Sequence, residues 1–369
     1  MSIKARILAL LFVAVLTTGS IGAALAGPGD DAAARALAWL AAQQNSDGGF
    51  SGGFSPGSGA GSTADVVLAV VAAGGDASGW QKDGRSPLDY MEAQVRAGRV
   101  TKPGEIAKTV LAVVATGQDP RRFGGVDLVA RLNALRKSGG YGGTLYEDTL
   151  VVLALVNAGQ SAPEDVVARL IVAQTDDGAW AFTGDTASGA GDTNTTALVV
   201  QALIAAGRRD AIGRALDYFR RTQNADAGWP YQSPSAFGTE TDSNSTANVL
   251  QALVAAGEPL SDWSQAGQSD PLGALVHLQD AQTGAFNYQA SAPGANLLAT
   301  AQAIPALKRV TLARLPVART SGAGAPSAAA DLAAPQTLPV AGGQLSPALA
   351  VALIAIGAAL AIAGWLARR

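Results

Sequence analysis

Two segments of the chain carry the densest groups of side chains that could do chemistry. Each begins with an aspartate and continues through polar residues into an apolar run, at 192–207 and at 242–257. Carboxylates grouped with amides and hydroxyls could act in general acid–base catalysis or provide oxygen ligands for Ca²⁺. The same residue types also cap the first turn of a helix, where they bind free backbone amides and offset the helix dipole. The sequence leaves both interpretations open.

The candidate ligand-binding residues lie at the starts of these two segments and of a third one. If the helices that they open run parallel in one ring, their polar groups converge at one mouth of that ring. The candidates are Asp192, Asn194, Thr195, Asp242, Asn244, Ser245, Glu147 and Asp148. Related helix starts carry Thr63, Asp65 and Glu105. Ligand contact is considered beside capping because the two richest starts carry more polar groups than one cap consumes.

Composition excludes several kinds of site. The chain has no cysteine, which excludes disulfides, thiolate nucleophiles and thiolate metal sites. Its single histidine, His277, excludes any site that needs two imidazoles, and its apolar neighbours predict that it packs inside the protein. The net charge is −3, so there is no basic surface for nucleic acid, and we expect no nucleic-acid partner.

The elements that must position these residues form a repeat. Six helices are apolar nearly all round and are therefore expected to be buried; five of them end at a glycine, a typical stop signal. They are 62–74, 105–117, 147–159, 192–207, 242–257 and 294–307. Six amphipathic helices alternate with them. These are 31–44, 87–97, 126–137, 163–174, 209–223 and 271–282.

Alternation of buried and half-exposed helices predicts an all-α fold, an α6/α6 toroid in which an inner ring is wrapped by an outer ring. An open superhelix of the same helix pairs is the competitor, but it needs polar terminal repeats. The first and last buried helices are as apolar as the central ones, which favours a closed ring.

The junctions after the amphipathic helices carry a recurring pair, a glutamine followed six or seven residues later by an aromatic residue. Glycine usually precedes the aromatic. The pairs are Gln44 and Phe50, Gln174 and Trp180, Gln223 and Trp229, and Gln279 and Phe286. We expect the glutamine amide to cap carbonyls at the end of its helix and the aromatic ring to pack over the next helix end. This pattern resembles the repeat of the terpenoid cyclase and protein prenyltransferase superfamily, the α/α toroids, over about 30–309.

The resemblance implies the toroid fold, while the catalytic residues of the superfamily are missing. Squalene-hopene-type cyclases protonate their substrate with an Asp-x-Asp-Asp sequence, which does not occur here. Protein prenyltransferases bind zinc through Asp, Cys and His, and this chain has no cysteine. We therefore expect no metal and no cofactor, and assign no catalytic residue.

The two ends of the chain read as export and anchoring signals around a toroid domain at 27–310. Residues 1–26 are typical of a cleaved signal peptide. A stretch rich in Ala, Pro and Gly, 311–343, predicts a stalk, and 344–369 predicts a transmembrane helix with a basic tail. The stalk contains a pentapeptide that resembles the Leu-Pro-x-Thr-Gly cell-wall sorting signal, with alanine at the threonine position. It consists of Leu338, Pro339, Val340, Ala341 and Gly342.

Three functions are consistent with this organisation. The first is a non-catalytic module, on the outer face of the membrane or in the cell wall, that binds an unidentified ligand or surface partner. The second, implied by the resemblance, is a terpenoid cyclase-like or prenyltransferase-like enzyme acting on an isoprenoid. The third is a small-molecule carrier, because the starts at 192–197 and 242–247 also resemble the inner-helix starts of vertebrate cobalamin carriers.

Overall fold

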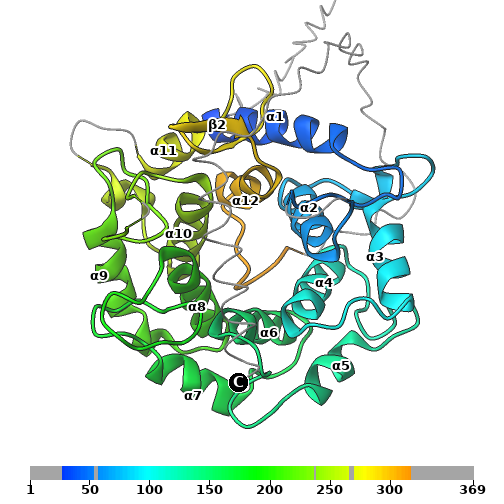
Figure 1. The fold of residues 1–369 in the computed structure, drawn as a ribbon, viewed down its shortest axis with the longest axis horizontal. Helices are drawn as coiled ribbons and strands as arrows, with labels where there is room; N and C mark the ends of the chain where they lie inside the picture. The colour runs from blue at the N-terminus through cyan, green and yellow to red at the C-terminus, as the bar shows by residue number, and fades with distance from the viewer. Residues whose placement is uncertain (1–26, 54–56, 237, 266–269, 317–369) are drawn as a thin grey trace, which may run out of the picture.

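The computed structural model describes residues 27–53, 57–236, 238–265 and 270–316. Within these ranges twelve α-helices alternate along the chain between two concentric rings (Figure 1). The inner ring consists of α2 (Ala60–Ala72), α4 (Pro103–Ala115), α6 (Leu145–Asn157), α8 (Thr193–Ala205), α10 (Ser243–Ala256) and α12 (Leu297–Leu307). The outer ring consists of α1 (Pro28–Ala42), α3 (Pro87–Arg96), α5 (Leu128–Ala134), α7 (Glu164–Val172), α9 (Gly213–Thr222) and α11 (Pro271–His277).

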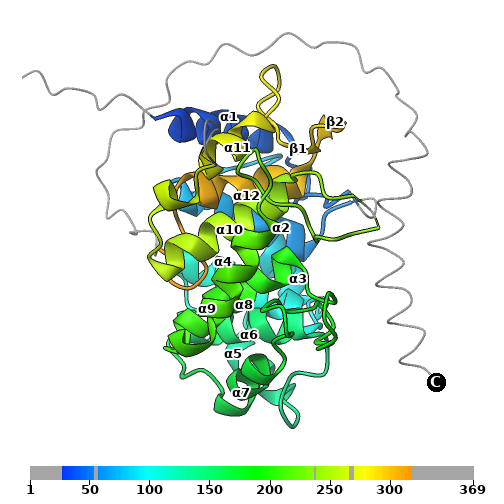
Figure 2. The same cartoon turned by 90° about the vertical axis from the view of Figure 1, so that its left-hand side faces the viewer.

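Short elements connect the two rings. Three 3-10 turns precede outer helices, namely η1 (Ala77–Gly79), η2 (Arg209–Ala211) and η3 (Leu260–Trp263). An antiparallel hairpin of β1 (Asn287–Gln289) and β2 (Ala292–Ala295) precedes α12, with Asn287 opposite Ala295. A side view shows this hairpin projecting at one end of the ring (Figure 2). A bridge between Gln289 and Asp242, the N-cap of α10, shows that it is the end where the inner helices start.

The ring is closed. Each inner helix packs against the next one in sequence, and the last, α12, packs against the first, α2 (Figure 1). In the outer ring α1 packs against α11 as well as α12, so the ends of the repeat are neighbours there too. The predicted closed ring is confirmed, and the open superhelix is excluded. Because an outer helix returns the chain between successive inner helices, the inner helices all run in the same direction.

The inner helices begin and end as their sequences predict. The carboxylate of Asp242 caps α10 by accepting a hydrogen bond from the Ser245 amide at 2.7 Å, and Asp192 caps α8 in the same way from Thr195. At the other end of α10, Gly257 has a φ of 77°, the left-handed conformation that glycine adopts without strain. Between these ends the apolar faces are buried, which contributes about 1.5–3 kcal/mol for each large aliphatic side chain.

The repeated glutamine links neighbouring repeats, and the expectation that it caps its own helix is wrong. The Gln174 side-chain amide donates to the carbonyl of Gly178 in its own turn, at 2.9 Å, and to that of Ala211 just before α9, at 3.3 Å. Gln44 and Gln223 make equivalent bonds. The last member, Gln279, donates to Ala32 of α1 at 2.8 Å, which joins the last outer helix to the first.

In two repeats, a tryptophan supplies the helix cap that was expected from glutamine. The indole N–H of Trp180 donates to the Leu170 carbonyl near the end of α7 at 2.6 Å, and Trp229 donates to Phe219 of α9 at 2.8 Å. All four aromatics of the repeat are fully buried. Their backbone amides donate to threonine hydroxyls at the fourth position of an inner helix, in Thr63, Thr196, Thr246 and Thr300. All four aromatics are therefore tied to the start of an inner helix, and the two tryptophans also bind the end of an outer helix.

The chain after α12 turns back across the interior of the ring, as the orange trace in Figure 1 shows. The Leu312 amide donates to the side-chain oxygen of Gln201 in α8 at 2.8 Å. The side chain of Asn157, the last residue of α6, donates to the Leu312 carbonyl and accepts from the Leu315 amide. The chain after α12 is therefore held inside the ring as far as Leu315.

The predicted signal peptide (1–26), sorting pentapeptide (338–342) and transmembrane segment (344–369) lie outside the described residues. Within the ranges that are described, no helix has both the length and the apolar character needed to cross a membrane.

We predict that replacing Gln279 with alanine weakens ring closure. The substitution removes the donor to Ala32 and to Gly284, and the carbonyl groups that lose it lie in a partly buried seam. The free energy of unfolding should fall by about 1–3 kcal/mol, measured by urea denaturation. The exposed Gln282, in the same turn, provides the control: Gln282→Ala should leave stability unchanged. Equal effects of the two substitutions would contradict the closing role.

Candidate ligand-binding site

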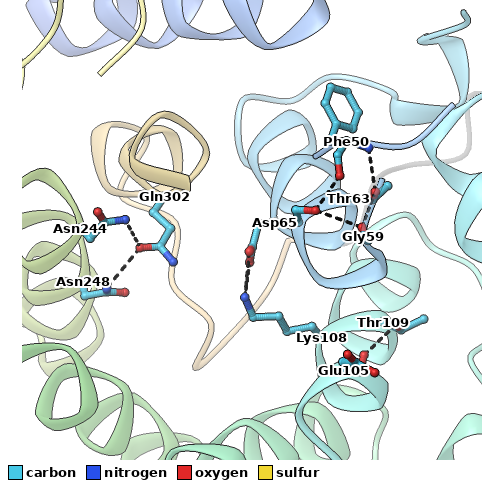
Figure 3. Close-up of polar contacts among 11 residues, drawn as sticks. Phe50, Gly59, Thr63, Asp65, Glu105, Lys108, Thr109, Asn244, Asn248 and Gln302 are labelled. Carbon is cyan, nitrogen blue, oxygen red and sulfur yellow. Dashed lines mark hydrogen bonds and ion pairs between the residues drawn. The ribbon is translucent and has the colours of Figure 1, made fainter. Parts of the chain in front are cut away.

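Residues at equal positions of the inner helices lie at equal levels in the ring, because these helices run in the same direction. Positions two and six are four residues apart and share one face of an α-helix. Position two holds Gly61, Gly104, Tyr146, Asn194, Asn244 and Leu298. Position six holds Asp65, Lys108, Leu150, Leu198, Asn248 and Gln302. Figure 3 shows that the labelled members of these two levels point into the space inside the ring.

An ion pair connects two adjacent inner helices at the sixth position. The ammonium group of Lys108 lies 2.8 and 2.9 Å from the two carboxylate oxygens of Asp65 (Figure 3). The two side chains are 20% and 11% exposed, so solvent reaches them inside the ring. Burial lowers the pKa of Lys108, but the charge of Asp65, the interaction with Tyr146 and the hydrogen bond to Asp65 together outweigh burial and leave that pKa above its ordinary value. The lysine therefore stays charged, and the pair is neutral as a whole.

A network of carboxamides faces this ion pair from the other side of the interior. Asn244 donates to the side-chain oxygen of Gln302 at 2.8 Å, and Asn248 donates to the same oxygen at 3.5 Å (Figure 3). Asn248 also donates to the Asn194 oxygen at 3.3 Å, so the network spans α8, α10 and α12. Asn194, Asn248 and Gln302 are partly exposed. Four polar amides therefore share the interior with the ion pair.

Tyr146 adds an aromatic surface at the second position. Its ring stacks on Phe182, with centroids 5.4 Å apart and planes 27° from parallel, and both residues are partly exposed. Burial raises the pKa of the Tyr146 hydroxyl above its ordinary value; the charge of Lys108 lowers it, and that of Asp65 raises it. The phenol is thus neutral and can both donate and accept a hydrogen bond.

The structure divides the predicted ligand residues into two groups. Asn194 and Asn244 belong to the interior network described above. Asp192, Thr195, Asp242 and Ser245 are almost fully buried in the caps of α8 and α10. The Ser245 hydroxyl, for example, donates to Asp242 at 2.8 Å. For these four residues, contacts within the helix caps explain why the two helix starts carry more polar groups than a single cap residue would supply.

The acidic pair at the start of α6 is also engaged in structural contacts. Glu147 forms a capping box with Thr144, in which each backbone amide donates to the other side chain at 3.2 Å. Asp148 is fully buried, accepts from the Tyr141 amide at 2.7 Å and pairs with Arg169. Asp148 is the fourth residue of α6, the position that threonine occupies in four other inner helices. Its carboxylate therefore binds the turn before α6 through the Tyr141 amide.

Sequence reasoning missed Lys108, Tyr146, Asn248 and Gln302. Their signal was position: Asn248 follows Asn244 by four residues, and aligning the helices on their fourth residues puts Lys108 and Gln302 at the same level. Among the described residues, no group of three carboxylates or imidazoles comes together as a metal site.

The expectation that His277 packs inside is wrong. Its side chain is exposed, and it lies on a shallow surface hollow together with Asp226 and Glu240. The apolar neighbours of His277 belong to the inward face of the short helix α11, whereas the histidine is on the other face.

Comparisons with known proteins show the fold. No family model matches the chain, and no curated protein matches it. The type II terpene cyclase MstE from Scytonema aligns with a TM-score of 0.55 at 15% identity, over 76% of this chain and 98% of that one. A protein from Actinoplanes gives 0.54 at 16% identity, over 76% and 99% of the two chains. The GH76A alpha-1,6-mannanase from Salegentibacter sp. HEL1_6 gives 0.52 at 11% identity, over 76% and 98%. The predicted α/α-toroid fold is thereby confirmed, and the likeness extends to the fold alone.

We predict that the stability of the ring increases as the pH falls toward 4. Burial raises the pKa of Asp242 to about 7 and that of Asp192 to about 6, although backbone amides that donate to them act in the opposite direction. An unfolded aspartate titrates near 3.8. Between these values the folded protein holds protons that the unfolded chain has lost, so stability decreases as the pH rises through this window.

Asp242→Asn tests this pH dependence, because asparagine still caps a helix but does not ionise. Between about pH 7.5 and about pH 5, Asp242 should contribute on the order of 2–3 kcal/mol to the change in unfolding free energy. Urea denaturation at both pH values should show a smaller change in the variant. Asp262→Asn, at an exposed position, is the control and should keep the full pH dependence. The same pH dependence in all three proteins would contradict the assignment.

Proposed function

We propose that this protein is an extracellular binding module that takes up a small polar molecule at the mouth of its ring. One observation carries the proposal: five inner helices direct polar side chains into a solvent-reached interior at the second and sixth positions. The central core of a toroid needs no such groups for stability, because burying a polar group costs free energy unless it is hydrogen-bonded. The location outside the cell rests on the signal peptide and anchor predicted from the sequence.

The geometry of the interior supports a single entrance. The polar residues lie in the first halves of the inner helices, whereas the segment around Leu312 is bound to Gln201 and Asn157 in the second halves. On one side of the mouth, Gly61 and Gly104 occupy the second position. A β-carbon added at Gly61 would meet nothing closer than the Lys108 stem at 4.0 Å, so the backbone there leaves room beside the ion pair.

The same interior is a poor match for an isoprenoid substrate. A hydrocarbon chain lying over the ion pair and the carboxamides would displace their water without replacing its hydrogen bonds. The buried aromatics Phe50, Trp180, Trp229 and Phe286 hold turns and helix ends. These contacts favour binding of a polar molecule over terpenoid cyclisation.

An enzymatic role is the second candidate. The solved structures that share the fold include a terpene cyclase and a mannanase, so the fold supports catalysis in other proteins. Asp65 is the carboxylate at the sixth position, and catalysis would require it to exchange its partner Lys108 for a substrate. Incubation with squalene, geranylgeranyl diphosphate and α-1,6-mannan would reveal turnover, and any product would replace the binding role.

We predict that Gly61→Phe blocks ligand uptake without unfolding the ring. The position is helical and an added β-carbon would contact only the Lys108 stem, so we expect the added ring to lie in the mouth rather than in the core. The measurement is the shift in unfolding temperature of the purified protein with a panel of neutral sugars, amino acids, nucleosides and cobalamin. A member that stabilises the native protein should lose its effect in the variant.

Gly213→Phe is the matched control for this experiment. Gly213 is exposed at the start of the outer helix α9, and an added side chain there also meets no atom within 4 Å. The control should bind as the native protein does. A panel member that binds the native protein and Gly61→Phe equally would place its site elsewhere, and a native protein that binds no member of the panel would refute the proposed function.

A further inference from the structure

The interior site has properties that select among polar ligands, and the first is its charge. Asp65 and Lys108 are the charged side chains at the two levels that face the space inside the ring, and each neutralises the other at 2.8 Å. An anionic ligand would have to compete with the carboxylate for the lysine, and a cationic one would have to compete with the lysine. The site therefore favours an uncharged molecule.

The second property is the mixture of donors and acceptors. Each carboxamide has an oxygen that accepts and an NH₂ group that donates twice. Within the described part of the chain, the Gln302 oxygen accepts two bonds, while its NH₂ group has no protein partner and faces the interior (Figure 3). The Asn194 side-chain oxygen likewise accepts from Asn248, and among the described residues its side-chain NH₂ group makes no donor bond. Such alternating donors and acceptors suit groups that do both, as alcohols do.

The third property is the ion pair as a two-point contact. An ammonium group has three N–H donors, and in Lys108 two of them are directed to the two oxygens of Asp65. One N–H donor of Lys108 and the remaining lone pairs of the Asp65 carboxylate are therefore left to bind a ligand, and they lie side by side on adjacent helices. Two neighbouring hydroxyls of one molecule can bind there together, one accepting from the lysine and the other donating to the carboxylate.

The fourth property is an apolar surface beside the polar one. Tyr146 stands at the second level, on the side away from Gly61, and its ring stacks on that of Phe182 from the loop before α8. Both are partly exposed. A pyranose ring has hydroxyls around its edge and C–H groups on its faces, so it could bind polar residues with its edge and the aromatic pair with a face.

We infer that the ligand class of this site is a neutral carbohydrate, bound as a hydroxyl-rich ring between the Asp65–Lys108 pair, the carboxamides and the Tyr146–Phe182 stack. This inference rests on the proposed binding function at the ring's mouth. No bond is made or broken: the sugar exchanges hydrogen bonds with water for hydrogen bonds with these residues.

The test is isothermal titration calorimetry of the purified protein with mannose, glucose, N-acetylglucosamine and short oligomers of each. At least one of these sugars should bind. Gln302→Leu and Asn248→Leu should each weaken that binding roughly tenfold, the effect of losing one or two hydrogen bonds. The double variant Asp65→Leu/Lys108→Met, which removes both charges together and leaves neither unpaired, should abolish it. Gln282→Leu on the outer surface is the control and should bind as the native protein does.

The outcomes separate the two proposals. Sugar binding that persists in the Gln302 and double variants, with native-like circular dichroism in all of them, overturns the carbohydrate inference. Binding of an amino acid, nucleoside or cobalamin but of no sugar, with loss in Gly61→Phe, also overturns it while the proposed function stands. Failure of every compound to bind refutes the proposed function itself.

Discussion

Closure of the ring is the constraint on which the rest of the molecule depends. Each inner helix buries apolar sides against the inner helices on both of its flanks, so the first and last must cover one another. The contact of α12 with α2 meets this need for the inner ring, and the bond from Gln279 to Ala32 joins the outer one. With both ends joined, no repeat needs a polar capping surface, which agrees with first and last inner helices that are as apolar as the central ones.

Closure also explains why two kinds of polar residue occur side by side at the helix starts. Parallel inner helices bring their N-termini to one end of the ring, where free amides require acceptors. Asp192 and Asp242 meet that requirement from buried positions, whereas Asn194 and Asn244, two residues further along the same segments, belong to the interior carboxamide network. Residues that are two positions apart therefore differ in role. The aspartate binds backbone amides of its own helix, and the asparagine binds side chains inside the ring.

The segment that follows α12 gives the two ends of the ring different characters. At one end the polar side chains are reached by solvent, and at the other the backbone around Leu312 is held by side chains of Gln201 and Asn157. These partners stand at unequal positions of α8 and α6, outside the regularity of the repeat. A symmetric scaffold thus acquires one polar mouth and one end crossed by its own chain.

The sequence by itself determined the helices, their alternation, the turns and the closed toroid, because these follow from local periodicity and from signals such as Gly257 and the Gln44–Phe50 junction. It also indicated Asn194 and Asn244, since they stand in the two richest polar starts. Only the tertiary structure decided that Asp148 and Asp242 are structural, that His277 is exposed, and that Lys108 meets Asp65 from 43 residues away. The physical reason is that a helix period fixes which residues share a face, while the direction of that face, toward the axis or toward a neighbouring turn, is set by packing between repeats.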